Sequence, residues 1–264
     1  MLLTAGCSFV WGDELEGFDN DPPTHQHLTF THLLAEKLGI EYVNRGVCGA
    51  CNEKIFREIT DHLHANPNKI THMVVLWSAW QRDEWVEYMP PERELKIGRQ
   101  NDITQFSSLR TQMIYDKTVR NLKEAWYWDG YNSRTDITHT LSKMKSLEII
   151  CDAAGIKLIQ GIFHRRNWEN IIAHLTNQVP EEAPYGPDEM PWGDKIEAVP
   201  EWEKWLMNSM GSLKDTSRVG MGRGLDMFTL SGKVGDMKPY GHPGEKTQVI
   251  FADELYEKFI DMDT

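Results

Sequence analysis

The sequence has no long hydrophobic run and little positive charge. No stretch approaches the roughly 18 consecutive apolar residues that a membrane-spanning helix needs. The 264 residues include 28 Lys and Arg against 40 Asp and Glu, a formal net charge of -12. Nucleic acids and anionic membranes attract basic surfaces, so this balance argues against both as partners. The sequence also begins without the basic residues and long apolar segment of a signal peptide, and we expect a cytoplasmic protein, in the host cytoplasm if it is viral.

Cysteine is scarce as well, with four in the chain, at Cys7, Cys48, Cys51 and Cys151. Cys48 and Cys51 form a CxxC pair, a spacing found in redox and zinc sites. A zinc site needs a second pair of ligands at suitable spacing, and the sequence has none. We therefore expect no metal site, and interpret these cysteines as small residues of a tight loop in a reducing compartment.

Strand-like and helix-like segments alternate along the chain. Short apolar runs typical of buried parallel strands alternate with amphipathic segments typical of helices. This alternation predicts an α/β fold, a three-layer sandwich with a central parallel sheet and helices on both faces. The predicted strands are 2–5, 41–43, 72–77 and 156–163. The predicted helices are 28–38, a segment capped by Asn52 and ended by Pro67, 138–154, and a C-terminal segment that follows the loop at 240–244.

Two irregular stretches interrupt this alternation, at about 83–137 and 164–227. Both contain several tryptophans. We interpret them as insertions in a single domain that spans 1–264. They form either a cap over the substrate or a small satellite core that holds two long loops against the sheet.

Polar and small residues follow the first three predicted strands. Ser8 follows the first strand, Gly49 and Asn52 the second, and Ser78 the third. Ligands of parallel sheets bind at the carboxyl ends of the strands. A serine hydroxyl needs a base to become a nucleophile, and His242, just before the last helix, supplies an imidazole. The backbone N–H of Gly49 and the amide of Asn52 suit an oxyanion; turn and capping roles are the structural alternatives for these residues.

Four sequence blocks occur in a characteristic order: GCSFVWG, NRGVCGACN, VVLWSAWQR and GHPGEKTQVIFADEL. In this order they resemble the SGNH/GDSL hydrolase superfamily, above all its divergent phage and bacterial members. The resemblance implies a flavodoxin-like sheet, with Ser8 as nucleophile and first oxyanion donor, Gly49 as a second donor and His242 as base. It implies no cofactor. It covers about residues 1–82, 138–163 and 228–260.

Two positions depart from the family's pattern. The third block usually ends in Gly-x-Asn, whose asparagine donates to the oxyanion; here the strand continues as LWSAWQR, and Ser78, Gln81 and Arg82 are the alternative donors. The family usually has an aspartate three residues before the histidine, where this chain has Pro239. Asp236, six residues before the histidine, is our candidate acid. The alternative is a Ser–His dyad oriented by a backbone carbonyl.

The resemblance implies a carboxylic ester hydrolase acting on a small-molecule or carbohydrate ester, such as a short acyl or acetyl group on a sugar. Trp11, Arg82 and Arg165 are our candidates for substrate contacts, since an aromatic ring packs on a sugar or acyl group and an arginine binds a carboxylate or phosphate. The alternatives are a catalytically impaired binding protein with the same fold and a phage structural or assembly partner. The sequence leaves the acyl group, the alcohol and the oligomeric state open.

Overall fold

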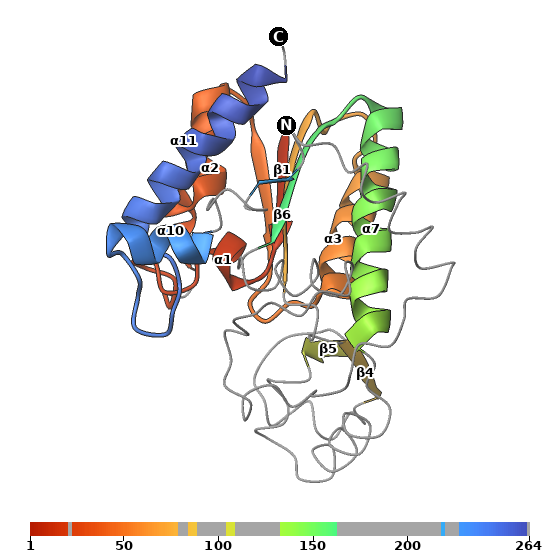
Figure 1. Ribbon diagram of the computed structural model, residues 1–264, viewed down its shortest axis with the longest axis horizontal. Coiled ribbons are helices and arrows are strands. Elements are labelled where there is room, and N and C mark those ends of the chain that lie inside the picture. Colours follow the sequence, from red (N-terminus) through yellow and green to blue (C-terminus); the bar gives the residue numbers. More distant parts are fainter. Residues whose placement is uncertain are drawn as a thin grey trace, which may run out of the picture.

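The described part of the chain is built around one parallel sheet (Figure 1). The computed structural model describes residues 1–20, 23–78, 84–88, 104–108, 133–162, 218–219 and 227–262. The strands of the sheet are β1 (Leu2–Gly6), β2 (Tyr42–Gly46), β3 (His72–Trp77), β6 (Lys157–Ile162) and β7 (Arg218–Val219). A separate antiparallel pair is formed by β4 (Glu84–Tyr88) and β5 (Thr104–Ser108).

Helices connect most of these strands. They are α1 (Ser8–Trp11), the 3-10 helix η1 (His25–Leu28), α2 (Phe30–Leu38), α3 (Asn52–Ala65), α7 (Ser133–Ala154), α10 (Met227–Val234) and α11 (Glu245–Asp261). Helices α2, α10 and α11 lie on one side of the sheet, and α3 and α7 lie on the other (Figure 1). The predicted three-layer α/β sandwich is confirmed.

The strand order in the sheet is β2-β1-β3-β6-β7, with every neighbouring pair parallel. Counted along the chain without the β4–β5 pair, this is the 2-1-3-4-5 order of flavodoxin-like sheets. Strand β1 is an interior strand: Leu3 lies opposite Val43 of β2 on one side and Met73 of β3 on the other. The first strand of the chain therefore sits where the strand order reverses.

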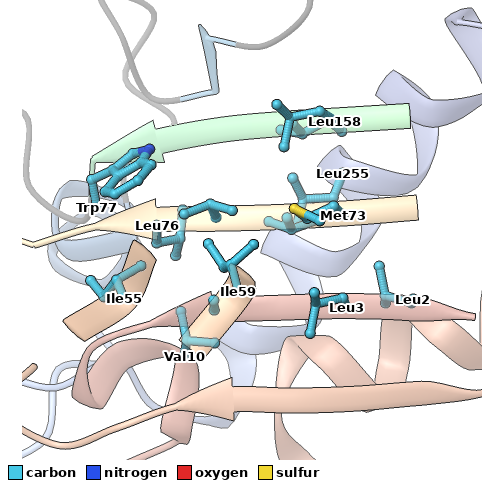
Figure 2. Close-up of a cluster of buried hydrophobic side chains, with 14 of the residues drawn as sticks. Leu2, Leu3, Val10, Ile55, Ile59, Met73, Leu76, Trp77, Leu158 and Leu255 are labelled. Atoms are coloured by element: carbon cyan, nitrogen blue, oxygen red, sulfur yellow. The ribbon is translucent and has the colours of Figure 1, made fainter. Parts of the chain in front are cut away.

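The core fills both faces of the central strands. All five residues of β1 are buried, as are the last five of β3, which is the pattern of a parallel sheet covered on both sides. The only hydroxyl in β1, that of Thr4, bonds the hydroxyl of Thr31 in α2 at 2.8 Å. Figure 2 shows the cluster, with Leu2 and Leu3 of β1, Met73 and Leu76 of β3, Leu158 of β6, Ile55 and Ile59 of α3 and Leu255 of α11.

Element boundaries differ from the sequence prediction at several places. The predicted helix 28–38 is divided, because the Thr29 hydroxyl accepts from the His32 N–H and so caps α2 after a separate 3-10 turn. Helix α3 is capped by the Cys51 sulfur rather than by Asn52, which is its first residue. Helix α7 begins at Ser133, five residues before the predicted start at 138.

The predicted insertions are described only in part. Strands β4 and β5 and the start of α7 lie in the first, and β7 lies in the second. Helix α10 begins at the end of the second, where no helix was expected; its sequence MFTLSGKV contains Gly, Ser, Thr and Val, which are weak helix formers. The cap interpretation itself concerns residues outside those described. Among the described helices, none is long and apolar enough to cross a membrane.

Candidate active site

The carboxyl ends of β1 and β3 lie at the point where the strand order reverses, the usual ligand site of a doubly wound sheet. Ser8 lies two residues after the end of β1, and Ser78 directly follows β3. The sequence predicted that both residues lie at this edge, and the register of β1 against β3 places them there.

The turn that carries Ser8 depends on two glycines. A Cβ on Gly46, at the end of β2, would collide with the backbone of Trp11, with the Trp11 Cα at 2.8 Å. A Cβ on Gly6, at the end of β1, would lie 2.8 Å from the carbonyl oxygen of Leu76. Only glycine allows α1 to pack directly on the ends of these strands. Ser8 is therefore held at the sheet edge by backbone contacts, and is only 6% exposed.

His242 reaches Ser8 from the far end of the chain. Its Nε2 lies 3.0 Å from the Ser8 Oγ, across 234 residues of sequence. The imidazole sits on the loop between α10 and α11, where the bridge between Met237 and Pro243 and a 2.8 Å bond from Lys238 N–H to the His242 carbonyl close a tight turn. The Phe9 ring packs edge-on against the imidazole, with centroids 5.5 Å apart. The distance between the Ser8 Oγ and His242 Nε2 is short enough for the hydroxyl proton to transfer to the imidazole.

The second nitrogen of His242 is bound by Glu14. The distance from His242 Nδ1 to Glu14 Oε2 is 2.7 Å, and the Glu14 side chain is 8% exposed. The same carboxylate accepts the backbone N–H of Tyr240 at 3.1 Å and that of His242 at 3.3 Å. A hydrogen-bonded carboxylate on Nδ1 fixes the tautomer that leaves Nε2 free to accept the serine proton.

The pKa of Glu14 is lowered from its ordinary value. Burial on its own would raise this pKa, but the hydrogen bonds from the His242 side chain and from the Tyr240 and His242 N–H groups, with the charge of His242, outweigh it. Glu14 is therefore an ionised partner of the imidazole at neutral pH.

The prediction of Asp236 as the acid is corrected by this geometry. Asp236 Oδ2 accepts the backbone N–H of Thr247, in the first turn of α11, at 2.8 Å. The Asp236 backbone carbonyl accepts the Gly244 N–H at 2.8 Å. Its carboxylate is thus used at the N-terminus of α11, and Glu14 occupies the place on His242 that Asp236 was expected to take. The sequence signal was the acidic segment GDELEG directly after the serine block.

The predicted oxyanion donors separate into two groups. Gly49 has φ 75°, in the left-handed region, and no described residue accepts its N–H or that of Ser8. Asn52 is different: it is 1% exposed, and its amide hydrogens donate to the Ser78 carbonyl at 3.2 Å and the Thr140 hydroxyl at 3.0 Å. The assignment of Asn52 as an oxyanion donor is therefore corrected to a structural role.

Ser78 is bound by the same asparagine, since its N–H donates to Asn52 Oδ1 at 2.7 Å. Its backbone groups therefore serve to join β3 to α3. Trp11, predicted to contact substrate, lies at the end of α1, where its carbonyl accepts from Gln26 and lies 2.8 Å from His25 Nε2. The indole packs edge-on against the His25 ring. Gln81, Arg82 and Arg165 lie outside the described residues.

A second carboxylate, missed from the sequence, lies on the serine side of the imidazole. Asp13 Oδ2 is 3.6 Å from His242 Nε2. Desolvation, the charge of Asp13 and a hydrogen bond to it raise the pKa of the Cys48 thiol to about 12, so this thiol is protonated at neutral pH. None of the four cysteines forms a disulfide, and no group of three or more metal-ligating side chains occurs among the described residues.

Comparison with known proteins finds only distant structural likenesses. No family model and no curated protein matches the chain. Among solved structures, a lipolytic protein of the G-D-S-L family from Desulfitobacterium hafniense matches with a TM-score of 0.40 and 11% identity, over 97% of this chain and 98% of its own. The esterase EstA from Pseudoalteromonas sp., inhibited by monoethylphosphonate, matches with a TM-score of 0.45 and 14% identity, over 99% and 97%. At these scores and identities the role of each site residue is argued from the geometry alone.

Proposed function

We propose that this chain is a serine hydrolase of the SGNH type that cleaves a carboxylic ester with Ser8, His242 and Glu14. The observation that carries the proposal is the continuous chain of short contacts from hydroxyl to imidazole to carboxylate, 3.0 Å and 2.7 Å long. These three groups come from α1, the α10–α11 loop and the segment after α1. This arrangement is that of a Ser–His–acid triad, with glutamate in place of aspartate.

The reaction follows from these contacts. His242 Nε2 takes the Ser8 proton as the oxygen attacks the ester carbonyl, and the N–H groups of Ser8 and Gly49 stabilise the tetrahedral oxyanion. Glu14 stabilises the imidazolium through Nδ1. Nε2 then protonates the leaving alcohol, and a water molecule activated by the same nitrogen releases the acyl group from Ser8. The proton that Nε2 takes from this water returns to the Ser8 oxygen as the acid product leaves, so the protons balance among Ser8, His242, the ester and water, and no cofactor is required.

The proposed substrate is a small-molecule or carbohydrate ester with a short acyl group, hydrolysed in the cytoplasm. The chain lacks the family's asparagine after β3, and loss of one oxyanion donor costs about 2.7–4 kcal/mol of barrier in a comparable enzyme. We therefore expect a slow hydrolase. The same departure is what favours the rival proposal, a binding protein or phage assembly partner that keeps this fold without turnover.

Labelling with a fluorophosphonate probe and hydrolysis of p-nitrophenyl acetate separate the two proposals. We expect the wild-type chain to label and to hydrolyse the ester, and Ser8→Ala to lose both while it remains folded by circular dichroism. Ser142→Ala, on α7 across the sheet, is the matched control and should retain both. A folded wild-type chain that neither labels nor exceeds the Ser8→Ala rate would establish the binding alternative.

A further inference from the structure

Asp13 is placed rigidly beside the nitrogen that must handle the leaving group. Its N–H donates to the Ser8 carbonyl at 3.0 Å, and so does the N–H of Gly12 at 2.9 Å. The Asp13 carboxylate lies 3.6 Å from His242 Nε2, and its side chain is 22% exposed. Glu14 already orients the imidazole from the other side, at Nδ1. Asp13 is therefore not needed to orient His242, and its position beside Nε2 calls for another role.

The charge of Asp13 is also not balanced by a nearby cation in the described part of the chain. No ion pair there joins Asp13 to a lysine or arginine, and the Cys48 thiol that hydrogen-bonds to its carboxylate is uncharged. Lys238, on the His242 loop, is bound at 2.7 Å by Glu245. The Glu14 carboxylate is already hydrogen-bonded to the His242 loop, through the Tyr240 N–H, the His242 N–H and His242 Nδ1. The carboxylate of Asp13 thus leaves a partly exposed negative charge at the reacting atoms.

This charge lies close to the position that the proposed reaction gives to the leaving group. In the proposed reaction, Nε2 protonates the leaving oxygen, so that oxygen lies about 3 Å from Nε2. Asp13 Oδ2 lies 3.6 Å from the same nitrogen, so the leaving oxygen lies within about 7 Å of this carboxylate. In the proposed reaction the carbonyl oxygen is bound by the N–H groups of Ser8 and Gly49.

We infer that Asp13 selects esters whose alcohol carries a positive charge, such as an ammonium alcohol, over uncharged esters of the same shape. The inference rests on the proposed function and names its substrate class. A cation about 5 Å from a partly exposed carboxylate gains only a fraction of the Coulomb energy of a buried pair, so we expect a preference of about 3- to 10-fold.

The test compares acetylcholine with its uncharged isostere, in which a tert-butyl group replaces trimethylammonium. We expect kcat/KM to favour acetylcholine by this factor in the wild-type chain at low salt, and Asp13→Asn to bring the ratio to about one. Glu16→Gln is the matched control: it removes the same charge from the same segment, three residues along, and should keep the preference. Using the ratio within each variant cancels any general loss of activity.

A second readout needs no turnover. Choline should slow fluorophosphonate labelling of Ser8 more than its tert-butyl isostere does, and Asp13→Asn should remove this difference. Equal kcat/KM values for the two esters in the wild-type chain, or a preference that survives Asp13→Asn, would overturn the role of Asp13 and leave the hydrolase proposal intact. Absence of any Ser8 labelling in the wild-type chain would instead overturn the hydrolase proposal and the inference with it.

Discussion

Glu14 adopts a left-handed backbone conformation, with φ 65°, that is strained for a residue with a Cβ. Such strain costs about 1–2 kcal/mol and persists only where surrounding contacts hold it. Here those contacts are the imidazole of His242 and the N–H groups of Tyr240 and His242. One side chain therefore both orients the proposed base and attaches its loop to the segment after α1.

Replacing Glu14 should reduce catalysis far more than replacing Asp236. Loss of the orienting acid costs about 10⁴-fold in kcat in a comparable triad, so we expect Glu14→Gln to lower kcat by about 10³- to 10⁴-fold. Asp236→Asn keeps an oxygen that can accept the Thr247 N–H, and should change kcat by less than about 3-fold. The measurement is steady-state hydrolysis of p-nitrophenyl acetate, and equal losses in the two variants would argue against Glu14 as the acid.

The lowered pKa of Glu14 also predicts how stability depends on pH. A carboxyl whose pKa is lower in the folded than in the unfolded state contributes stability above its unfolded pKa, near 4.5, and loses it as the pH falls through the folded value. The difference in unfolding free energy between wild type and Glu14→Gln should therefore be largest at neutral pH and shrink in acid. Urea unfolding over a pH series measures it; a difference independent of pH contradicts the prediction.

At the scale of elements, the connection between α10 and α11 is what positions the base. Asp236 follows α10, its N–H donates to the Ser231 carbonyl at 3.0 Å, and its carboxylate caps the first turn of α11. His242 lies between these attachments. The short loop thus has both ends tied to helices that pack on each other, which leaves the imidazole little freedom.

Removing this cap should be visible as a loss of stability. Asp236→Ala leaves the Thr247 N–H without its acceptor, and loss of a helix cap costs about 0.5–2 kcal/mol. We expect a decrease of this size in the free energy of unfolding from urea denaturation. Asp236→Asn, which retains an acceptor, is the matched control and should lose less; a larger loss for Asn than for Ala would show that the capping bond is not the cause.

A second connection between elements runs through Asn52, which joins α3 to the end of β3 and to Thr140 of α7. It is buried, and both polar atoms of its side chain have partners. From the sequence, an asparagine at the start of a helix indicates a cap or an available amide. Its structural role becomes visible only in the fold, where Thr140 of α7, nearly ninety residues further along the chain, accepts a hydrogen bond from its amide.

At the scale of the whole molecule, stability should be highest in the middle of the sheet. Strand β1 pairs with β2 and β3, β3 pairs with β1 and β6, and both strands are covered by helices on each face. Amides there open only when the whole sheet opens. In native-state hydrogen exchange we expect the slowest amides within Leu2–Gly6 and His72–Trp77. Slower exchange in α11 than in these strands would contradict this view.

A feature of this protein could be predicted from the sequence when it depends on neighbouring residues, and could not when it depends on contacts between distant segments. The strands and the alternation that predicts a parallel sheet are local patterns, and the structure confirms them. The site is predicted in part: Ser8 and His242 were expected to meet, and they lie in contact. The expected acid was sought near the histidine, as in the family, whereas Glu14 comes from 228 residues away in sequence.

The sequence by itself determined the α/β class, because buried strands and amphipathic helices follow from the spacing of apolar residues within each segment. It also determined that a serine would stand at the end of the first strand, between glycines. Tertiary structure alone decided which carboxylate binds Nδ1 of His242, why Asp236 does not, and that Asp13 lies beside Nε2. These choices depend on distances of about 3 Å between segments joined only by the fold, and no pattern within one segment contains them.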